Sequence, residues 1–197
     1  MSFRLGLTGS IGMGKSTTAR MFGDAGCAVW DADAAVHRMY APGGAAVDPM
    51  RAAFPQAIVD GAVSRDRLKE IIACDPDALK RIETIVHPLV AADRAAFAEK
   101  TSADIVVFDI PLLFETGGDA LMDATVCVTI PAEEQRARVL ARPGMTAAQF
   151  DAILSKQMPN AEKVRCADYV VVTDTLDHAR EQVARIVAQI REQLKDA

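Results

Sequence analysis

The sequence is poor in the residues that metal-binding and disulfide-stabilised proteins need. Its 197 residues include only 4 cysteines and 3 histidines, with no C-x-x-C pair and no histidine cluster. Such spacing indicates neither a zinc site nor a disulfide framework. We interpret all four cysteines as buried thiols: Cys27, Cys74, Cys127 and Cys166.

Long apolar runs and an excess of positive charge are also missing. No run approaches the roughly 20 apolar residues of a membrane helix, and the first residues lack the basic segment and apolar core of a secretory signal. We therefore expect a cytoplasmic protein without a membrane partner. The formal net charge of −5 is opposite to the basic face of general nucleic-acid binders, so we expect no nucleic-acid partner.

The chain does contain a regular alternation of short apolar runs and longer segments. Each run is separated from the next by enough chain for a crossover helix, which predicts an α/β fold with a five-stranded parallel sheet flanked by helices. Ligands of such sheets bind beyond the carboxyl ends of the strands. The predicted strands are Phe3 to Leu7, Cys27 to Trp30, Ile105 to Phe108, Thr125 to Ile130 and Tyr169 to Val172.

Two intervals between strands are longer than one helix needs. The first follows the second strand, and His87-Pro88 predicts a break between two of its helices. Its predicted helices are Ala32 to Tyr40, Ala45 to Phe54, Arg65 to Ala73, Pro76 to Val86 and Pro88 to Lys100. In the second interval, a helix from Ala132 to Arg142 is followed by a capping box of Thr146 and Gln149, which begins a helix toward Met158. We interpret this basic helical pair as a mobile lid.

A phosphate-binding loop directly follows the first predicted strand. Glycines let successive backbone N–H groups curl around an anion, Lys15 can reach a terminal phosphate, and the Ser16 hydroxyl can ligate Mg²⁺. The helix predicted from Lys15 to Ala25 adds its N-terminal dipole. The loop therefore predicts binding of a nucleoside triphosphate, and its residues are Gly9, Ser10, Ile11, Gly12, Met13, Gly14, Lys15 and Ser16.

Acidic residues follow the second and third predicted strands. Asp31 is interpreted as a helix cap and Asp33 as a general base for an acceptor hydroxyl, in preference to the alternative that Asp33 is a solvated first-turn acid. Asp109 ends a run of four apolar residues, as in a Walker B strand whose carboxylate meets magnesium directly or through water. Together these carboxylates predict phosphoryl transfer to a small hydroxyl compound.

Three arginines lie on the presumed lid. Arg138 and Arg142 are four residues apart on one helical face, where they could stabilise the charge of a transferring phosphoryl group. Arg136 is better explained as part of a solvated helix face. From spacing alone, His87 is a polar residue at a helix junction.

Taken together, these motifs resemble the dephospho-coenzyme A kinase family of P-loop kinases over almost the whole chain. The resemblance includes the loop from Leu7 to Thr17, Asp31-Ala32-Asp33 with His37, Arg65 before Leu68, and His87-Pro88-Leu89-Val90. It continues through Asp109-Ile110-Pro111-Leu112-Leu113-Phe114-Glu115-Thr116-Gly117, the segment Gln135 to Arg142 with Gln157, and Ala167-Asp168-Tyr169-Val170. At Thr173 and Thr175 the chain departs from the Asn and Gly that family members often carry near the adenine.

The resemblance implies that ATP, with Mg²⁺, phosphorylates the ribose 3′-hydroxyl of dephospho-coenzyme A. It implies a nucleotide-binding core of residues 1–33, 101–131 and 167–197, an acceptor-binding insertion of residues 34–100, and a lid of residues 132–166. Asp33, Lys15 and Arg138 would be catalytic, and Ser16 and Asp109 would face the metal. ATP would contact Gly9, Gly12, Met13, Gly14, Lys15, Ser16, Thr17 and, along the adenine, Arg142. The acceptor would contact Asp33, Arg65, His87, Pro111, Leu112, Leu113, Phe114 and Glu115. We favour a monomer.

Three other classes of protein share some of these features. An adenylate-kinase-like nucleoside monophosphate kinase has a similar core and an arginine lid, but Asp33 favours a hydroxyl acceptor over a phosphate. A GTPase switch usually carries Asn-Lys-x-Asp, whereas the only asparagine here, Asn160, precedes Ala161. A non-catalytic nucleotide-binding protein is the third alternative.

Overall fold

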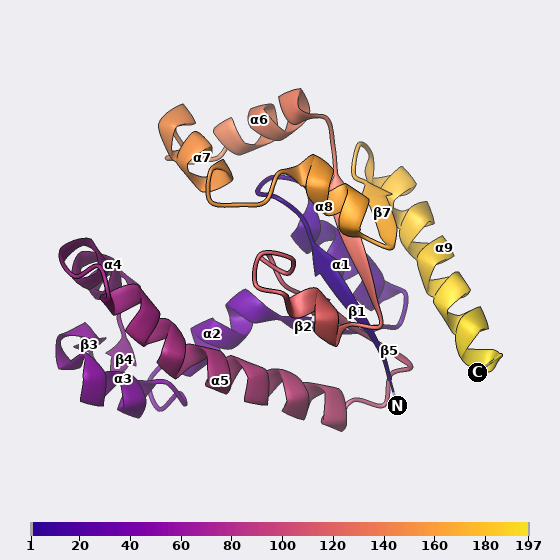
Figure 1. The fold of residues 1–197 in the computed structure, drawn as a ribbon. Helices are drawn as coiled ribbons and strands as arrows, with labels where there is room; N and C mark the ends of the chain where they lie inside the picture. Colours follow the sequence, from indigo (N-terminus) through magenta and orange to yellow (C-terminus); the bar gives the residue numbers. More distant parts are fainter. Residues whose placement is uncertain (1, 197) are drawn as a thin grey trace. The chain divides into compact units, whose positions relative to one another are not determined.

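The computed structural model describes residues 2–196, and its centre is the predicted five-stranded sheet (Figure 1). The strand order is β2-β5-β1-β6-β7, and β1 pairs in parallel with both β5 and β6. The strands are β1 (Phe3–Thr8), β2 (Ala28–Asp31), β5 (Ile105–Asp109), β6 (Ala124–Thr129) and β7 (Tyr169–Val172). The α/β class predicted from the alternation of apolar runs is therefore confirmed, with strand ends shifted by at most one residue.

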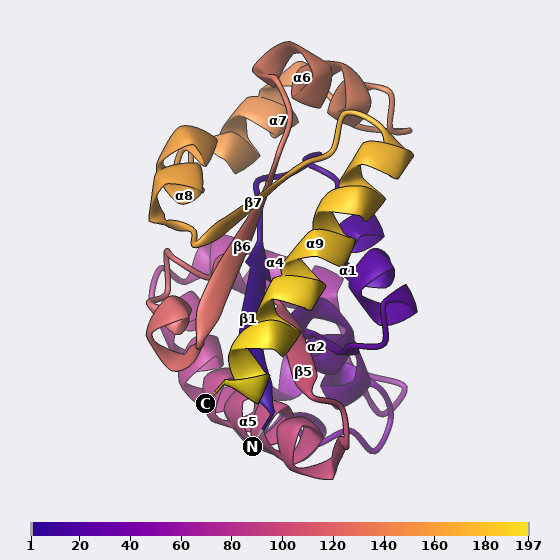
Figure 2. The same ribbon diagram turned by 90° about the vertical axis from the view of Figure 1, so that its right-hand side faces the viewer.

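Helices α1 (Lys15–Asp24) and α9 (Leu176–Lys195) pack against each other and against the sheet (Figure 2). The core between them contains Leu5, Leu7 and Phe22, which are completely buried. Along α9, the buried apolar side chains include Val183, Ile186, Val187 and Ile190. Leu176 and Leu194, near the two ends of the helix, are 61% and 38% exposed.

Residues 31–100 form a compact unit of their own. It contains α2 (Ala32–Tyr40), α3 (Val47–Ala53), a 3₁₀ turn η1 (Pro55–Ala57), the hairpin β3 (Ile58–Val59) and β4 (Ala62–Val63), α4 (Arg65–Cys74) and α5 (Ala78–Lys100). The hairpin turns at Asp60 and Gly61, which both have positive φ angles (49° and 79°), as a type I′ turn requires.

The break predicted at His87-Pro88 is wrong, since α5 runs unbroken through Pro88. Proline removes only one i to i−4 hydrogen bond, the one that would reach the Thr84 carbonyl. Both Thr84 and Pro88 are on the exposed side of α5, while Ile82 and Val86 are buried. Packing of the apolar side keeps the helix continuous, and water can reach the exposed side.

The segment predicted as a lid consists of α6 (Ala132–Leu140), α7 (Ala147–Leu154) and α8 (Asn160–Cys166). The capping box is confirmed: Thr146 Oγ1 accepts the N–H of Gln149, and Gln149 Oε1 accepts the N–H of Thr146. Helix α8, which packs against β6, was not predicted. A short 3₁₀ turn, η2 (Gly118–Leu121), connects β5 to β6.

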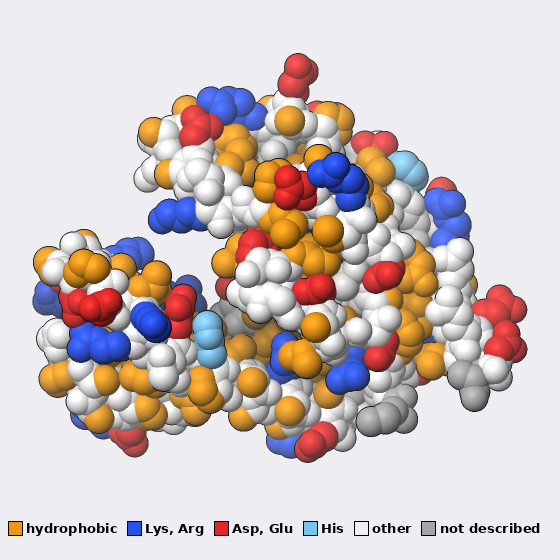
Figure 3. Space-filling view, in the orientation of Figure 1, with side chains coloured by type: hydrophobic (Ala, Val, Ile, Leu, Met, Phe, Trp, Pro, Cys, Tyr) orange, Lys and Arg blue, Asp and Glu red, His pale blue; other side chains and the backbone are white. Residues whose placement is uncertain are grey.

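The rest of the chain, up to Trp30 and from Thr101 onward, forms the second compact unit, which includes α6, α7 and α8. Within residues 2–196, no helix is both long and apolar enough to cross a membrane. Acidic and basic side chains are interspersed on the face shown in Figure 3, and many pair locally, as Lys69 does with Asp66 on α4.

The expectation that every thiol is buried is half right. Cys27 and Cys127 are buried, and burial raises the pKa of each to about 11. Cys74 and Cys166 are exposed because each lies at the last residue of a helix, α4 or α8.

Candidate active site

The phosphate-binding loop lies between β1 and α1, so its backbone is anchored at both ends by regular structure. Gly12 and Gly14 have φ angles of 80° and 88°, in the left-handed region that favours glycine. A side chain at Gly12 would also collide with Val139 of α6, and one at Gly14 would be crowded by Thr173. Local strain and close packing therefore both require glycine here.

Side chains from distant segments hold this loop from outside. Gln135 Nε2 donates to the Ile11 carbonyl at 2.8 Å, and Gln157 Oε1 accepts the Ile11 N–H at 3.1 Å. The Thr173 hydroxyl donates to the Met13 carbonyl at 2.8 Å. These contacts fix the backbone at Ile11 and at Met13, on either side of Gly12.

Lys15 and Asp109 meet at the carboxyl ends of neighbouring strands. Lys15 Nζ forms an ion pair with Asp109 Oδ1, and Asp109 is only 2% exposed. The register places Leu7 of β1 opposite Asp109 of β5, which explains why the end of β5 is beside the loop that follows β1. The predicted phosphate ligand and the predicted metal ligand are thus brought together.

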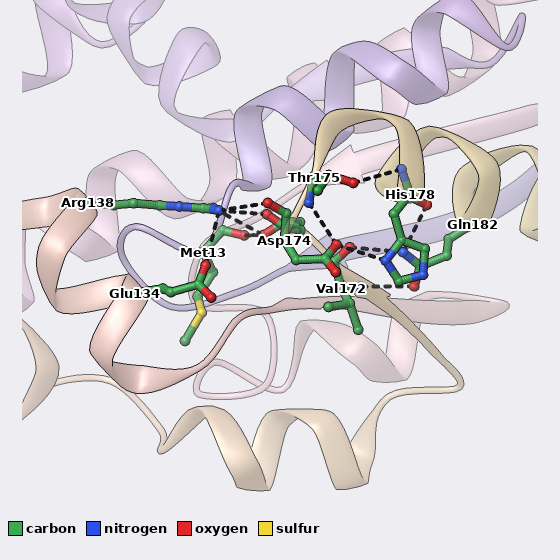
Figure 4. Close-up of polar contacts among 9 residues, drawn as sticks. Met13, Glu134, Arg138, Val172, Asp174, Thr175, His178 and Gln182 are labelled. Carbon is green, nitrogen blue, oxygen red and sulfur yellow. Dashed lines mark hydrogen bonds and ion pairs between the residues drawn. The ribbon is translucent and has the colours of Figure 1, made fainter.

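A cavity of about 150 Å³ opens next to the first turn of α1. Arg138 of α6 reaches over it and donates to the Thr173 carbonyl at 2.8 Å, while Glu134 lies 3.6 Å from the same guanidinium (Figure 4). The cavity is lined by Gly14, Thr17, Thr18, Met21, Arg138, Thr173, Asp174, Thr175, Leu176 and Ala179. Arg142, predicted along the adenine, is exposed beyond the end of α6 and does not line this cavity.

The turn from β7 into α9 forms the outer rim of the cavity. Asp174 contacts the Thr175 N–H and His178 Nδ1, at 2.7 and 2.8 Å (Figure 4). The hydrogen bond with His178 is the main reason that the pKa of Asp174 is lowered. Thr175 caps α9 by accepting the N–H of His178. The two threonines that depart from the family pattern therefore have distinct roles. Thr173 hydrogen-bonds the phosphate loop, and Thr175 caps α9.

Glu115 belongs to the run Pro111 to Glu115, which the resemblance assigned to the acceptor. Its Oε1 pairs with Lys163 at 2.8 Å and accepts the Met158 N–H at 2.9 Å. Lys163 is completely buried and also donates to the Pro111 carbonyl at 3.1 Å. Burial on its own would raise the pKa of Glu115, but the hydrogen bonds from Lys163 and Met158 outweigh it, and the pKa is lowered.

Lys163 was missed from the sequence. Lysine is almost never fully buried unless it is paired, so a lysine in a polar segment is expected to be solvated. Nothing in the sequence around Lys163 indicates otherwise. The partner that pairs with it, Glu115, lies 48 positions earlier in the chain. The Glu115 Oε2 atom is buried and has no hydrogen-bond partner.

Four further predicted residues lie in the unit of residues 31–100. Asp31 caps α2 by accepting the Ala34 N–H at 2.9 Å, as expected, and Asp33 is exposed in the first turn of that helix. Arg65 opens α4 with its guanidinium 6.0 Å from the centre of the Tyr40 ring. His87 is exposed on α5.

Two negative findings complete the site. Arg136 pairs with Asp151 at 3.1 Å and lies over the Phe150 ring, so its contacts are within the helical pair. Among the described residues, no cluster of three or more histidine, cysteine or acidic side chains is placed to hold a metal ion.

Comparison with known proteins gives the family. The sequence profile described as dephospho-CoA kinase matches residues 3–179. A dephospho-CoA kinase of Ruegeria pomeroyi is 73% identical over 191 residues, which cover 97% of each chain. The chain belongs to the dephospho-CoA kinase family. The resemblance inferred from the loop, Asp-Ala-Asp, His-Pro and Pro-Leu-Leu-Phe-Glu motifs is thereby confirmed.

Solved structures share the fold of this chain. A crystal structure of a Thermus thermophilus protein matches with a TM-score of 0.86 and 32% identity, covering 95% of this chain and 97% of that one. A dephospho-CoA kinase from Campylobacter jejuni shares the fold, with a TM-score of 0.71 and 22% identity over 98% of this chain and 99% of the other.

Proposed function

We propose that the chain transfers the γ-phosphoryl group of ATP to the ribose 3′-hydroxyl of dephospho-CoA, which gives CoA and ADP. The observation that carries this proposal is family membership across residues 3–179. In addition, side chains of three other segments hydrogen-bond the backbone of the phosphate loop. ATP and dephospho-CoA are the two substrates.

The phosphates of ATP occupy the loop. Backbone N–H groups from Gly12 to Thr17 donate to phosphate oxygens, and the N-terminus of α1 adds its positive dipole. When the nucleotide enters, the ammonium group of Lys15 leaves the Asp109 carboxylate and pairs with a phosphate oxygen. Both the carboxylate and the phosphate are anions that this ammonium group can pair with.

Magnesium fits the oxygen groups at this end of the sheet. The Ser16 hydroxyl and the Asp109 carboxylate are hard oxygen ligands, and Mg²⁺ in such sites takes its other ligands from phosphates and water, so no larger protein cluster is needed. When bound, the ion neutralises charge on the β- and γ-phosphates.

The adenosine of ATP occupies the cavity beside α1. Its walls are the apolar Met21 and Ala179 and the polar Thr173 and Arg138, a mixture typical of small-molecule pockets. We assign Arg138 to this end of the nucleotide, in place of the catalytic role inferred from the sequence, because its guanidinium is fixed at the Thr173 carbonyl. Arg142 is assigned to a later contact, made when the helical pair α6–α7 closes.

The acceptor half of the site uses Asp33 as general base and Arg65 and His87 as contacts to dephospho-CoA. Asp33 is an exposed carboxylate two residues beyond β2, and β2 neighbours β5 in the sheet. A carboxylate is what a hydroxyl acceptor needs to lose its proton. Pro111 to Phe114 line the acceptor, and Glu115 holds that segment in place through Lys163.

A coupled assay of ADP release tests the assignment. With ATP, Mg²⁺ and dephospho-CoA we expect ADP and CoA in equal amounts. Release of ADP with AMP or another nucleoside monophosphate, but not with dephospho-CoA, would reassign the chain to the nucleoside monophosphate kinases. Asp33→Asn should lower kcat by roughly 10²- to 10⁴-fold with ATP affinity retained, and turnover near the wild-type value would remove Asp33 as the base.

A further inference from the structure

The backbone of Ile11, at the tip of the phosphate loop, is held on both sides by glutamines. Gln135 is on α6 and Gln157 is in the connection between α7 and α8. Gln135 satisfies the Ile11 carbonyl, and Gln157 satisfies the Ile11 N–H. Both polar groups of one loop residue are thus taken by side chains of the helices that follow β6.

The direction of each hydrogen bond is fixed by the backbone. A carbonyl can only accept, so Gln135 must present its NH₂ group; an N–H can only donate, so Gln157 must present its oxygen. Gln135 is 5% exposed, so its own amide has little access to water as a substitute partner. One turn further along α6, Val139 occupies the space that a side chain at Gly12 would need. Helix α6 therefore contacts the loop at two successive residues.

The connection that carries Gln157 is itself anchored. The next residue, Met158, donates its N–H to Glu115, which pairs with the buried Lys163 of α8. The position of Gln157 is therefore determined by a buried network and not by a freely moving surface segment.

We propose that Gln135 and Gln157 are positioning residues that hold the phosphate loop in its anion-binding shape and link that shape to the placement of α6, α7 and α8. This inference rests on the proposed use of ATP. Neither glutamine touches the transferred group; each acts through the Ile11 backbone. Nucleotide affinity then depends on whether each side chain presents a hydrogen-bond donor or an acceptor to the Ile11 backbone.

Two substitutions of equal charge separate this role from a general electrostatic effect. Gln135→Glu and Gln157→Glu each add one negative charge beside Ile11. Glutamate at position 157 keeps the acceptor that the N–H requires, whereas glutamate at position 135 places an acceptor against a carbonyl and leaves that carbonyl unsatisfied. We expect the Kd for Mg-ATP, measured by isothermal titration without acceptor, to rise about tenfold for Gln135→Glu relative to Gln157→Glu.

Gln149→Glu is the matched control, because it adds the same charge on α7 while its capping oxygen is retained. Its Kd should stay within about twofold of wild type. Equal losses in Gln135→Glu and Gln157→Glu, or a larger loss at position 157, would overturn the proposal.

If Gln135→Glu does not fold, as judged by circular dichroism, Gln135→Met and Gln157→Met replace the pair. Each removes one hydrogen bond with little change in shape, and each should raise the KM for ATP severalfold while the KM for dephospho-CoA stays near wild type. Unchanged ATP binding in both would also overturn the proposal. Because the titration needs only ATP, a wild-type chain that binds ATP without phosphorylating dephospho-CoA would contradict the proposed function and leave this test valid.

Discussion

Lys163 is completely buried and pairs with Glu115, and two backbone groups also hydrogen-bond to the pair. Its ammonium is shared between Glu115 and the Pro111 carbonyl, and Glu115 in turn accepts the Met158 N–H. A buried pair of this kind contributes little net stability compared with apolar residues of the same shape. Removing one member alone, however, leaves the other as an uncompensated buried charge.

Lys163→Met should therefore lower the free energy of unfolding by about 3–5 kcal/mol, measured by urea denaturation. The double variant Lys163→Met with Glu115→Gln should recover much of that loss, since neither charge is then present. Lys69→Met is the matched control: its pair with Asp66 has the same 2.8 Å separation but is exposed, so its effect on stability should be far smaller. A Lys163→Met variant as stable as the control would show that Lys163 is not a buried charge in solution.

The same pair predicts how stability depends on pH. The pKa of Glu115 is lowered in the folded chain from its ordinary 4.5, so the folded state favours the ionised carboxylate more than the unfolded state does. This contribution is fully present above about pH 4.5 and is lost as the pH falls through the lowered value. Urea midpoints measured between pH 7 and pH 3 should fall less steeply for Glu115→Gln than for wild type. Parallel curves would contradict the lowered pKa.

At the level of single residues, the sequence predicted the roles that depend only on neighbouring positions in the chain. The phosphate loop could be identified because its glycines, Lys15 and Ser16 are contiguous, and Asp31 because a helix cap depends on the next three residues. Lys163 and Gln135 could not be identified as buried, since their partners, Glu115 and Ile11, are 48 and 124 positions away in the chain. Solvent exposure of Cys74 and Cys166 likewise depends on where α4 and α8 end.

Among the secondary-structure elements, α5 is the one that deviates most from its local sequence. Pro88 lies inside 23 helical residues, where proline is about 3 kcal/mol less favourable than alanine. Tertiary packing of Ile82 and Val86 offsets this cost.

Pro88→Ala should therefore raise the free energy of unfolding, by up to about 3 kcal/mol, because it restores a donor to the Thr84 carbonyl and removes the ring clash. Thermal and urea unfolding measure the change. Ala92→Pro, one turn later on the exposed side of the same helix, is the reciprocal control and should destabilise by a similar amount. Loss of stability in Pro88→Ala would mean that the helix is kinked to suit the proline.

The other differences among the elements have separate causes. The hairpin β3–β4 was predictable, because Asp60-Gly61 between apolar pairs is a strong turn signal. Helix α8 was not, since its seven residues carry Glu162, Lys163 and Arg165 and show too little apolar periodicity to predict a helix. Contact with β6 and the Lys163 pair stabilise it instead.

On the scale of the whole molecule, the predicted site residues are divided between two compact units. The phosphate loop, Asp109, Arg138 and Pro111 to Glu115 belong to the unit that contains most of the sheet, and Asp33, Arg65 and His87 belong to residues 31–100. The sequence predicted an insertion beginning at residue 34, close to the observed division after Trp30, because a helical segment of about seventy residues interrupts the alternation of strands. We propose accordingly that ATP binds the first unit, and that dephospho-CoA binds residues 34–100 with further contacts from Pro111 to Phe114.

Hydrogen exchange can test this division of labour with each ligand alone. A non-hydrolysable ATP analogue with Mg²⁺ should slow exchange of the amides from Gly12 to Thr17, the proposed phosphate contacts, and near Thr173, beside the cavity proposed for adenosine. Dephospho-CoA should slow exchange within residues 34–100, most strongly around Arg65 and His87. The Asp33→Asn variant should give the same two patterns, because it removes a base and not a binding surface. If dephospho-CoA protects only the first unit, the acceptor site is not in the helical insertion, and Arg65 and His87 lose their assigned role while the phosphate loop keeps its own.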